Sequence, residues 1–519
     1  MKKIMKKIFS YCLYMLSLGT LASCDKGLEE LNENKVNPTT VDPAMLLNNA
    51  ILNTSFPTKT QIYEMSIVQQ MVTPNGGVLA GGNFNQDSRD VTGPPVWAVY
   101  YQNVIKYTHD AISKTKDDPA RANLYNMARI WQAYTYMILT DTYGAIPYTE
   151  GGAGLTDQIF FPKYDQQEDI YPKLIDELTD ASAALGASGA TVESADVLYA
   201  GNITQWKKFG YSLLLRAGMR LGKIDPSTAQ SVVQAAFAGG VITDNADDAY
   251  MRHDANYQNP AGGMLNGTEA ANWYLVNSFV DTLKNNNDPR LQAIAIRYIG
   301  ATSGSGQTVD KGTATPADQI GMPMGYDNGT IVARATADGL ASFYDYSQVD
   351  RRRLVKTNSP MFFVTAAQTH LLLAEAAYKG WIIGGLTAAA YFTAGIKAHI
   401  DQMAMYDAAS AISATDRDMY ADAHPLETGR ELEQINTQYW IASFLNGPEA
   451  FANFRRTGYP SLTPNPYGQP GNPDVPNGTF IRRIGYPTSE LSVNTENVNA
   501  AVAAMGPDKL STRVWWDKE

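Results

Sequence analysis

Residues 365–403 read TAAQTHLLLAEAAYKG, then WIIGG, then LTAAAYFTAGIKAHIDQM. Apolar and small residues recur at helical spacing in the first and last pieces, and the glycine-containing middle piece interrupts them. Residues 365–379 and 386–403 are therefore predicted to form two helices, separated by a turn that begins at Gly380. Small residues at the contacts and a breaker between two helices are typical of tetratricopeptide-like helical pairs.

The same period recurs nearer the N-terminus and predicts three further helices, with buried stripes of Leu124, Met127, Trp131, Tyr134 and Ile138, of Ile170, Leu174, Leu178, Ala181 and Leu185, and of Trp206, Phe209, Leu213 and Ala217. These helices do not recur at the fixed spacing of a true tetratricopeptide array. We therefore expect an all-α dominated protein built from repeat-like helical pairs, with an irregular helical domain as the alternative.

Four long segments rich in Gly, Asn and Pro separate the helices: residues 74–95, 244–266, 300–329 and 458–478. Loops of this length are uncommon in compact domains and often carry function. Each contains at least one aromatic residue, namely Phe84, Tyr257, Tyr326 and Tyr467. An aromatic residue in a polar loop either contacts a ligand or anchors the loop on the core, and the sequence leaves both interpretations open.

Composition excludes some classes of protein. The 519 residues include 52 Asp and Glu against 41 Lys and Arg, which gives a formal net charge of −11. Binding to duplex DNA needs a dense basic surface that displaces counterions, so nucleic acid is not an expected partner. Both cysteines, Cys12 and Cys24, lie near the N-terminus, and the rest of the sequence therefore offers no disulfide, thiolate metal site or cysteine nucleophile.

The N-terminus predicts a bacterial lipoprotein. Four lysines among the first seven residues precede a moderately apolar stretch at residues 8–23, which is too short to span a membrane. The stretch ends in Leu21-Ala22-Ser23-Cys24, which resembles a bacterial lipobox. We predict a signal peptide at residues 1–23 and lipidation of Cys24; an ordinary signal peptide with a chance cysteine is the alternative.

The remaining domain boundaries follow from the composition and from the helical spacing of apolar residues. Residues 24–44 are expected to be the lipidated cysteine and a polar leash, and residues 45–519 a single body. Within the body, we expect helical pairs mainly in residues 45–240 and 360–455. The loop-rich parts are expected in residues 241–359 and 456–519.

Motifs of catalysis or metal binding are missing from the sequence. The five histidines lack the spacing of metal ligands, and no nucleophile elbow, Walker loop or dinucleotide fingerprint occurs. The acidic run at residues 244–248 lacks the Gly and Glu of a calcium loop. We expect no catalytic residues, no metal and no cofactor. A glycoside hydrolase needs two carboxylates in one cleft, and the sequence alone does not exclude such a pair.

An ordered series of blocks resembles the SusD/RagB family of Bacteroidota outer-membrane lipoproteins, and most closely its SusD-like branch. In addition to the lipobox, the blocks are Leu31-Asn32-x-Asn34-x-x-Asn37-Pro38, Asp141-x-Tyr143-Gly144-x-Ile146-Pro147-Tyr148, Pro162-x-Tyr164-Asp165, Trp206-x-Lys208-Phe209-x-x-Ser212-Leu213-x-x-Arg216, Asn287-Asp288-Pro289-Arg290, Leu373-Ala374-Glu375-Ala376 with Gly380-Trp381, Gln438-x-Trp440, Arg455-Arg456-Thr457-Gly458-Tyr459-Pro460 and Arg482-Arg483-Ile484-x-Tyr486-Pro487. These blocks span almost the whole chain.

The resemblance implies a non-enzymatic surface protein that binds oligosaccharides, or in some members peptides, and that lies over a SusC-like TonB-dependent transporter. It also implies a right-handed scaffold of four tetratricopeptide-like helical pairs, with a loop-rich remainder that carries the ligand site. We expect most of the quoted blocks to have structural roles. Arg455-Arg456 and Arg482-Arg483 could pair with acidic residues or with a partner surface.

By their position relative to the family, the ligand-binding candidates are Asn83, Phe84, Asn85, Arg89, Trp97, Asn256, Tyr257 and Tyr326. Flat aromatic faces suit the CH faces of sugar rings, and amides and guanidinium groups suit their hydroxyls. The sequence leaves two alternative functions open: a surface glycoside hydrolase, and a structural subunit that gates its transporter with no ligand of its own.

Overall fold

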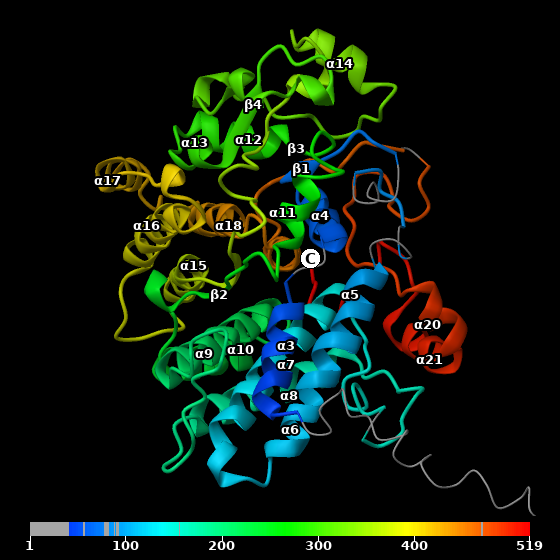
Figure 1. Cartoon of the computed structure of the whole chain (residues 1–519), viewed down its shortest axis with the longest axis vertical. Helices are drawn as coiled ribbons and strands as arrows, with labels where there is room; N and C mark the ends of the chain where they lie inside the picture. Colours follow the sequence, from blue (N-terminus) through cyan, green and yellow to red (C-terminus); the bar gives the residue numbers. More distant parts are fainter. Residues whose placement is uncertain are drawn as a thin grey trace, which may run out of the picture.

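The computed structural model describes residues 41–55, 58–76, 83–87, 89, 93–154, 156–468 and 471–519. The predicted signal segment, Cys24 and most of the leash lie outside these residues. Helices dominate the described part, and the strands are short, which confirms the predicted fold class (Figure 1).

Most of the N-terminal helices form the layer at the bottom of Figure 1, whereas α4 lies nearer the centre. Each of α6, α7, α8 and α9 packs against the helix that follows it. The helices of this part are α3 (Pro43–Asn53), α4 (Thr58–Ile67), α5 (Gly93–Tyr100), α6 (Lys106–Thr115), α7 (Ala122–Tyr143), α8 (Gln167–Ala184), α9 (Ile203–Arg220) and α10 (Pro226–Gly239). The three predicted helices correspond to α7, α8 and α9.

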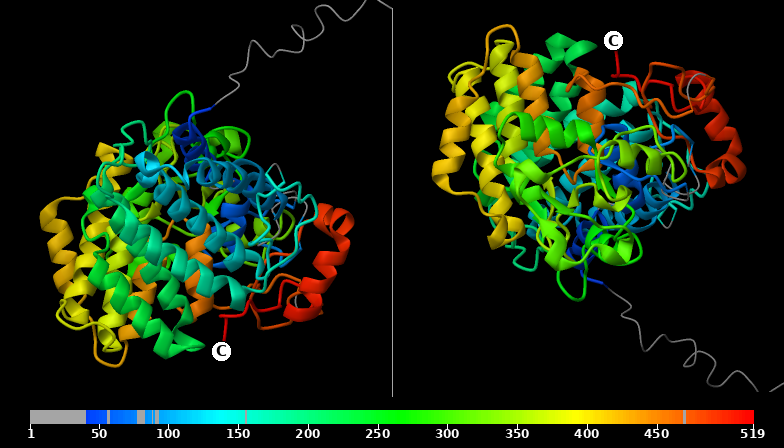
Figure 2. Two further views of the ribbon diagram at one scale, coloured as in Figure 1. Left: turned by 90° about the horizontal axis from the view of Figure 1, so that it is seen from below. Right: turned by 90° about the horizontal axis from the view of Figure 1, so that it is seen from above.

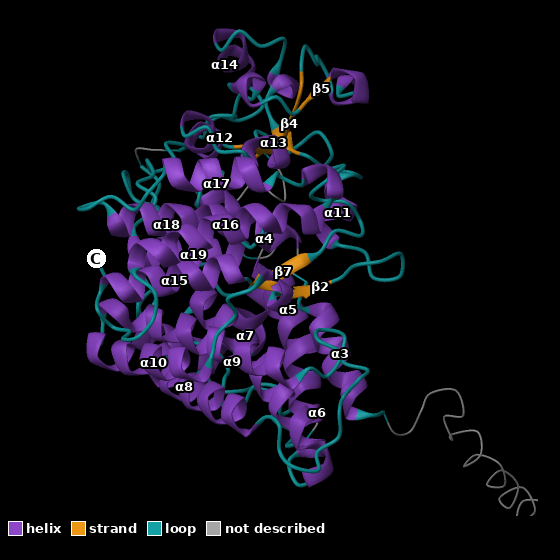
Figure 3. Cartoon of the chain, turned by 90° about the vertical axis from the view of Figure 1, so that its left-hand side faces the viewer, coloured by secondary structure: helices purple, strands orange, loops and turns teal. Residues whose placement is uncertain are grey.

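The C-terminal helices stack on this layer, as Figure 3 shows from the side. They are α15 (Ala366–Tyr378), α16 (Ala388–Tyr406), α17 (Ala414–Ala423), α18 (Glu431–Ala442), α19 (Gly447–Thr457), α20 (Thr488–Val493) and α21 (Thr495–Met505). The predicted pair is present as α15 and α16, which pack closely together. They lie at the opposite edge of the molecule from α20 and α21 (Figure 2).

The middle of the chain combines short helices and strands with long loops, and much of it lies at the top of Figure 1. Its elements, together with strand β1 from the N-terminal part, are β1 (Met71–Val72), β2 (Ala249–Met251), α11 (Pro260–Leu265), β3 (Tyr274–Leu275), α12 (Asn277–Asn285), α13 (Arg290–Ile294), β4 (Ala295–Tyr298), β5 (Gly312–Thr313), α14 (Ile331–Ala337), β6 (Gln348–Val349) and β7 (Met361–Val364). The strands pair antiparallel as β1–β3, β2–β7 and β5–β4–β6. A small second core beneath this part includes Tyr274, Met322 and Ile331.

Local signals explain where key helices begin and end. Helix α15 begins with a reciprocal capping box, in which Thr365 accepts from the backbone of Gln368 and the Gln368 side chain accepts from the backbone of Thr365. Helix α7 ends at Gly144, whose φ of 83° is unfavourable for residues with a side chain. A Cβ there would lie 2.4 Å from the sulfur of Met505, so the predicted turn also allows close packing.

A buried ion-pair network joins the two helical layers. Arg220 at the end of α9 is fully buried and pairs with Asp141 of α7 at 3.2 Å and with Glu449 of α19 at 2.7 Å. Burial alone would raise the pKa of Glu449, but Arg216 and Arg220 hold it below its ordinary value. Three buried side chains complete the carboxylate hydrogen bonds: Tyr171 and Trp516 donate to Asp141, and Tyr439 donates to Glu449.

Two further networks use the arginines of the quoted blocks. Arg456 makes two hydrogen bonds to Glu375, of 2.8 and 2.7 Å, and both side chains are buried. Arg290 pairs with Asp288 and also donates to Gln438 at 2.7 Å. Arg456 therefore pairs with an acidic residue of its own chain, one of the two roles that the sequence left open.

The network at Arg220 gives a stability prediction. Arg220→Ala leaves Asp141 buried without its cation and Glu449 with Arg216 alone, so we expect the free energy of unfolding to fall by about 3–5 kcal/mol in chemical denaturation. The matched control is Arg430→Ala, whose side chain is 53% exposed and pairs with Glu427 and Glu433. Its loss should cost far less, because solvent screens exposed ion pairs. Similar effects of the two substitutions would contradict the assigned role.

A buried carboxyl group in α4 makes stability depend on pH. One oxygen of Glu64 accepts a 3.4 Å hydrogen bond from Thr142, and no group within the described residues hydrogen-bonds to the other oxygen. Burial raises the pKa of Glu64 to about 8, although the charge of Arg455 opposes the rise. The folded protein therefore retains this proton at pH values where the unfolded chain has lost it.

The protonation of Glu64 makes the stability fall as the pH rises. Because the folded pKa is raised, the stability that the protonated group contributes is complete below the unfolded value near 4.5 and is lost as the pH rises through about 8. Glu64→Gln should stabilise the protein relative to wild type by at least about 1 kcal/mol more at pH 9 than at pH 5. Denaturation of both proteins across this range measures the difference; parallel pH profiles would refute the assignment.

Candidate ligand-binding site

Three loops that lie far apart in the sequence meet beside the middle part of the chain. The side-chain amide of Asn85 donates to the backbone oxygens of Asn465 at 2.9 Å and Tyr467 at 3.1 Å. The Asn465 amide donates in return to the backbone oxygen of Asn83. All three asparagine-linked contacts are buried or half-buried, so they fix the N-terminal loop on the C-terminal one.

Phe84 packs beneath Tyr467 at this junction. The ring centroids are 4.4 Å apart with an interplanar angle of 53°. Phe84 is only 4% exposed, whereas Tyr467 is half-buried. Phe84 therefore supports the neighbouring ring, and Tyr467 presents the more accessible aromatic surface.

The third loop, which precedes α14, contacts the same tyrosine. The Tyr467 hydroxyl donates to Asp327 at 3.3 Å. Partial burial and the charge of Asp327 raise the pKa of Tyr467, so this hydroxyl stays protonated at neutral pH. A Cβ on Gly325 would lie 2.6 Å from Cγ of Pro466, so only glycine allows the two loops to approach this closely.

Tyr326, which precedes Asp327 in the third loop, adds a second half-buried aromatic ring, and this ring packs against the small second core. The guanidinium group of Arg334 lies 6.0 Å from the centre of this ring, and Arg334 itself pairs with Asp338 at 2.8 Å. We call Phe84, Tyr326, Asp327 and Tyr467 the loop junction. It offers two tyrosine rings and a carboxylate, groups that suit the faces and hydroxyls of a sugar.

The structure gives Arg89 a connecting role. Its guanidinium group pairs with Asp87 in its own loop and with Asp508, at 2.6 Å, near the C-terminus. Asp508 also lies 2.8 Å from Arg483. Arg89 therefore ties the predicted N-terminal ligand loop to the C-terminal segment, and its two ion pairs occupy the guanidinium group.

Trp97 belongs to α5 and lies in an aromatic cluster, and no ring contact between described residues joins it to the loop junction. Its ring stacks on Tyr164 at 5.9 Å and meets Tyr143 edge-on at 5.1 Å. One side of Trp97 lines a separate cavity of about 580 Å³, next to a π-helical turn over Tyr101–Ile105. Such turns often occur at functional sites, so this cavity is a second possible location for a ligand.

Asn256 and Tyr257 lie on a different surface loop. Asp254 accepts hydrogen bonds from both of their backbone N–H groups, at 2.7 and 2.9 Å. The Tyr257 ring is 56% exposed, and its backbone oxygen hydrogen-bonds with His253. No hydrogen bond or ring contact between described residues joins this loop to the loop junction.

Two negative findings concern the described part of the chain. It contains no group of three or more His, Cys, Asp or Glu side chains placed to hold a metal ion. None of the helices described there is both long and apolar enough to cross a membrane.

The structure adds Tyr467 and Asp327 to the ligand-binding candidates, although the sequence analysis names Tyr467 as an aromatic residue of a long loop. Tyr467 lies in one of the four long loops, and its aromatic character in a polar segment was the available signal. Asp327 carries no such signal, because its proximity to Tyr467 depends on how two distant loops fold together.

The fold defines a scaffold of paired helices with long loops that bear aromatic residues. The comparisons identify the family. A family model named SusD-like, described as starch-binding and associating with the outer membrane, matches residues 34–487, so the chain belongs to this family. The resemblance found in the sequence is confirmed, and with it the expectation of a binding protein rather than an enzyme.

Solved structures agree with this assignment. A chitin-binding protein is 30% identical, with a TM-score of 0.79, over 92% of this chain and 100% of that one. A chitin-binding SusD homologue from Flavobacterium johnsoniae is 25% identical, with a TM-score of 0.71, over 92% and 98%. A SusD homologue from Bacteroides uniformis, 23% identical with a TM-score of 0.73 over 92% and 100%, shares the fold. A search of curated proteins found no match.

Proposed function

We propose that this protein captures an oligosaccharide at the loop junction and delivers it to a SusC-like TonB-dependent transporter of the outer membrane. The observation that carries the proposal is the half-buried ring of Tyr467, which Phe84 supports and whose hydroxyl donates to Asp327; the half-buried Tyr326 precedes Asp327 in the same loop. A rigid aromatic surface binds a sugar at low entropic cost because little ordering accompanies contact.

Relatives support the choice of sugar class. Two of the similar structures are described as chitin-binding, and the family is described as starch-binding. Chitin and starch fragments are both neutral and present CH faces and hydroxyl groups, which suit tyrosine rings and a carboxylate. We favour a chitin-type oligosaccharide because the 30% identical protein is described as chitin-binding.

Substitution of the two rings tests the site. Tyr326→Ala and Tyr467→Ala should each weaken binding of chitohexaose at least about tenfold, the effect of losing an aromatic anchor. Isothermal titration calorimetry on the chain without its predicted signal segment measures this. Tyr378→Ala removes an equally large ring that is 46% exposed on α15 and should leave the affinity unchanged.

Other outcomes separate the alternatives. Binding of maltohexaose in place of chitohexaose would keep the site and change the sugar, and binding of peptides alone would favour the peptide-binding branch. Loss of binding only on Trp97→Ala would move the site to the cavity beside α5. Release of shortened sugars from a labelled oligosaccharide would contradict a binding function without catalysis.

Attachment to the membrane is a separate proposal that rests on the lipobox at Cys24. Multiple acyl chains would hold the body at the outer membrane, since each buried CH₂ contributes about 0.8 kcal/mol. Cys24→Ala should therefore shift the protein from the membrane fraction to the soluble fraction of the cell envelope. Metabolic labelling with a fatty acid should mark the wild type alone; equal labelling of both would contradict the assignment.

A further inference from the structure

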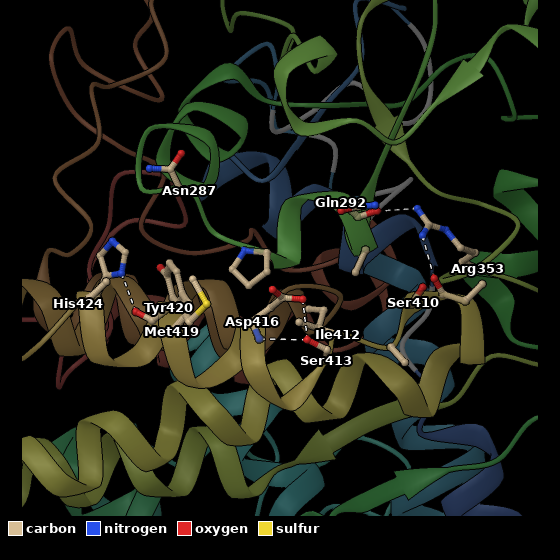
Figure 4. A pocket seen from close by; sticks show the side chains of 15 residues that line it. Asn287, Gln292, Arg353, Ser410, Ile412, Ser413, Asp416, Met419, Tyr420 and His424 are labelled. Carbon is tan, nitrogen blue, oxygen red and sulfur yellow. Dashed lines mark hydrogen bonds between the residues drawn. The ribbon is translucent and has the colours of Figure 1, made fainter.

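A cavity of about 690 Å³ lies apart from the loop junction and from Trp97, between α13 and α17 (Figure 4). One side comes from the turn before α13, with Asn287, and from α13 itself, with Gln292. The facing side comes from α17, with Tyr420, and from the segment before it, with Ser410. The quoted Asn287-Asp288-Pro289-Arg290 block therefore builds a cavity wall as well as a buried ion pair.

The cavity wall is rigid because the ion-pair network lies directly behind it. Tyr420 is 6% exposed, with the guanidinium group of Arg290 5.7 Å from its ring centre on one side. His424, directly after the end of α17, packs against the same ring with the ring centroids 4.2 Å apart. Arg290 is held in turn by Asp288. The aromatic wall is thus fixed before any ligand arrives.

Charged ligands do not fit the groups around the cavity. Arg353 reaches the rim, but it pairs with Asp350 and donates to the backbone oxygens of Gln292 and Ala409. It has little capacity left for an anion. Asp416 is the one carboxylate among the lining residues and accepts from Ser413, so the cavity also lacks the ligand set of a divalent cation.

Neutral hydrogen-bonding groups remain. Ser410 is 1% exposed, and no group in the described chain hydrogen-bonds to its Oγ. Asn287 and Gln292 line the opposite side of the cavity, and their exposed side-chain amides make no hydrogen bond to described residues. A hydroxyl and two amides around an aromatic wall match a neutral, hydroxylated ring.

We propose that this cavity is a second, independent subsite for a single neutral sugar residue. It goes beyond the proposed function, because it adds a site on the helical side of the molecule, and it rests on that function only for the choice of probe. A monosaccharide fits the volume, and its hydroxyls would satisfy Ser410, Asn287 and Gln292.

A cavity-filling substitution tests the subsite. Ala423 lines the cavity, is exposed and ends α17, so Ala423→Trp should block the space without disturbing the core. Saturation-transfer difference NMR with N-acetylglucosamine and with glucose, on protein carrying Tyr326→Ala and Tyr467→Ala, should show weak binding of at least one sugar. Adding Ala423→Trp should reduce that signal at least fivefold.

Two further variants make the result decisive. Gln292→Leu removes one exposed amide and should also weaken the signal, whereas Ala235→Trp, at an exposed position of α10, should not. No residual monosaccharide signal in the doubly substituted protein, or a signal that Ala423→Trp leaves intact, would overturn the proposal. Loss of transporter co-purification on Ala423→Trp with unchanged sugar binding would identify the surface as a protein contact and also overturn it.

Failure of the subsite and failure of the proposed function give different results. If the loop junction does not bind oligosaccharide, chitohexaose affinity is unaffected by Tyr326→Ala and Tyr467→Ala, while the monosaccharide signal still depends on Ala423. If only the subsite is wrong, Tyr326→Ala and Tyr467→Ala weaken chitohexaose binding, whereas the monosaccharide signal is absent or is unaffected by Ala423→Trp.

Discussion

The placement of Arg220 between Asp141 and Glu449 is the constraint on which the two helical layers depend. The three residues come from α9, α7 and α19, and all are buried. A buried cation between two carboxylates tolerates little change in geometry, because every charge left without its partner is costly in a dry interior. The C-terminal segment joins the same network through Trp516. The N-terminal and C-terminal helical layers are thereby held in one relative arrangement.

This arrangement also positions the loops. The segments around residues 84, 326 and 467 leave the helical layers at separate points, and they can meet only if the layers keep their relative positions. At the meeting point, Asn85 and Asn465 exchange side-chain to backbone hydrogen bonds, and Phe84 supports Tyr467. The site therefore inherits its rigidity from the scaffold, as expected of a loop site on a fixed support.

The sequence predicts much of the fold because the spacing of apolar residues and the residues that end helices are local features. The stripe from Leu124 to Ile138 lies on α7, and the 365–403 pair is present with its break at Gly380. The site is less predictable, because its residues are joined by long-range contacts. Tyr326 was singled out by its position in a loop, but its relation to Tyr467 and Asp327 depends on tertiary packing. Composition likewise did not reveal that Phe84 supports another ring and that Arg89 is held by two carboxylates.

A crystal structure with chitohexaose bound tests the central claim most directly. The account predicts a sugar ring in van der Waals contact, about 4 Å, with the rings of Tyr326 and Tyr467, and a hydroxyl within hydrogen-bonding distance of Asp327. An oligosaccharide found only beside Trp97 or Tyr257, with the loop junction empty, would contradict it.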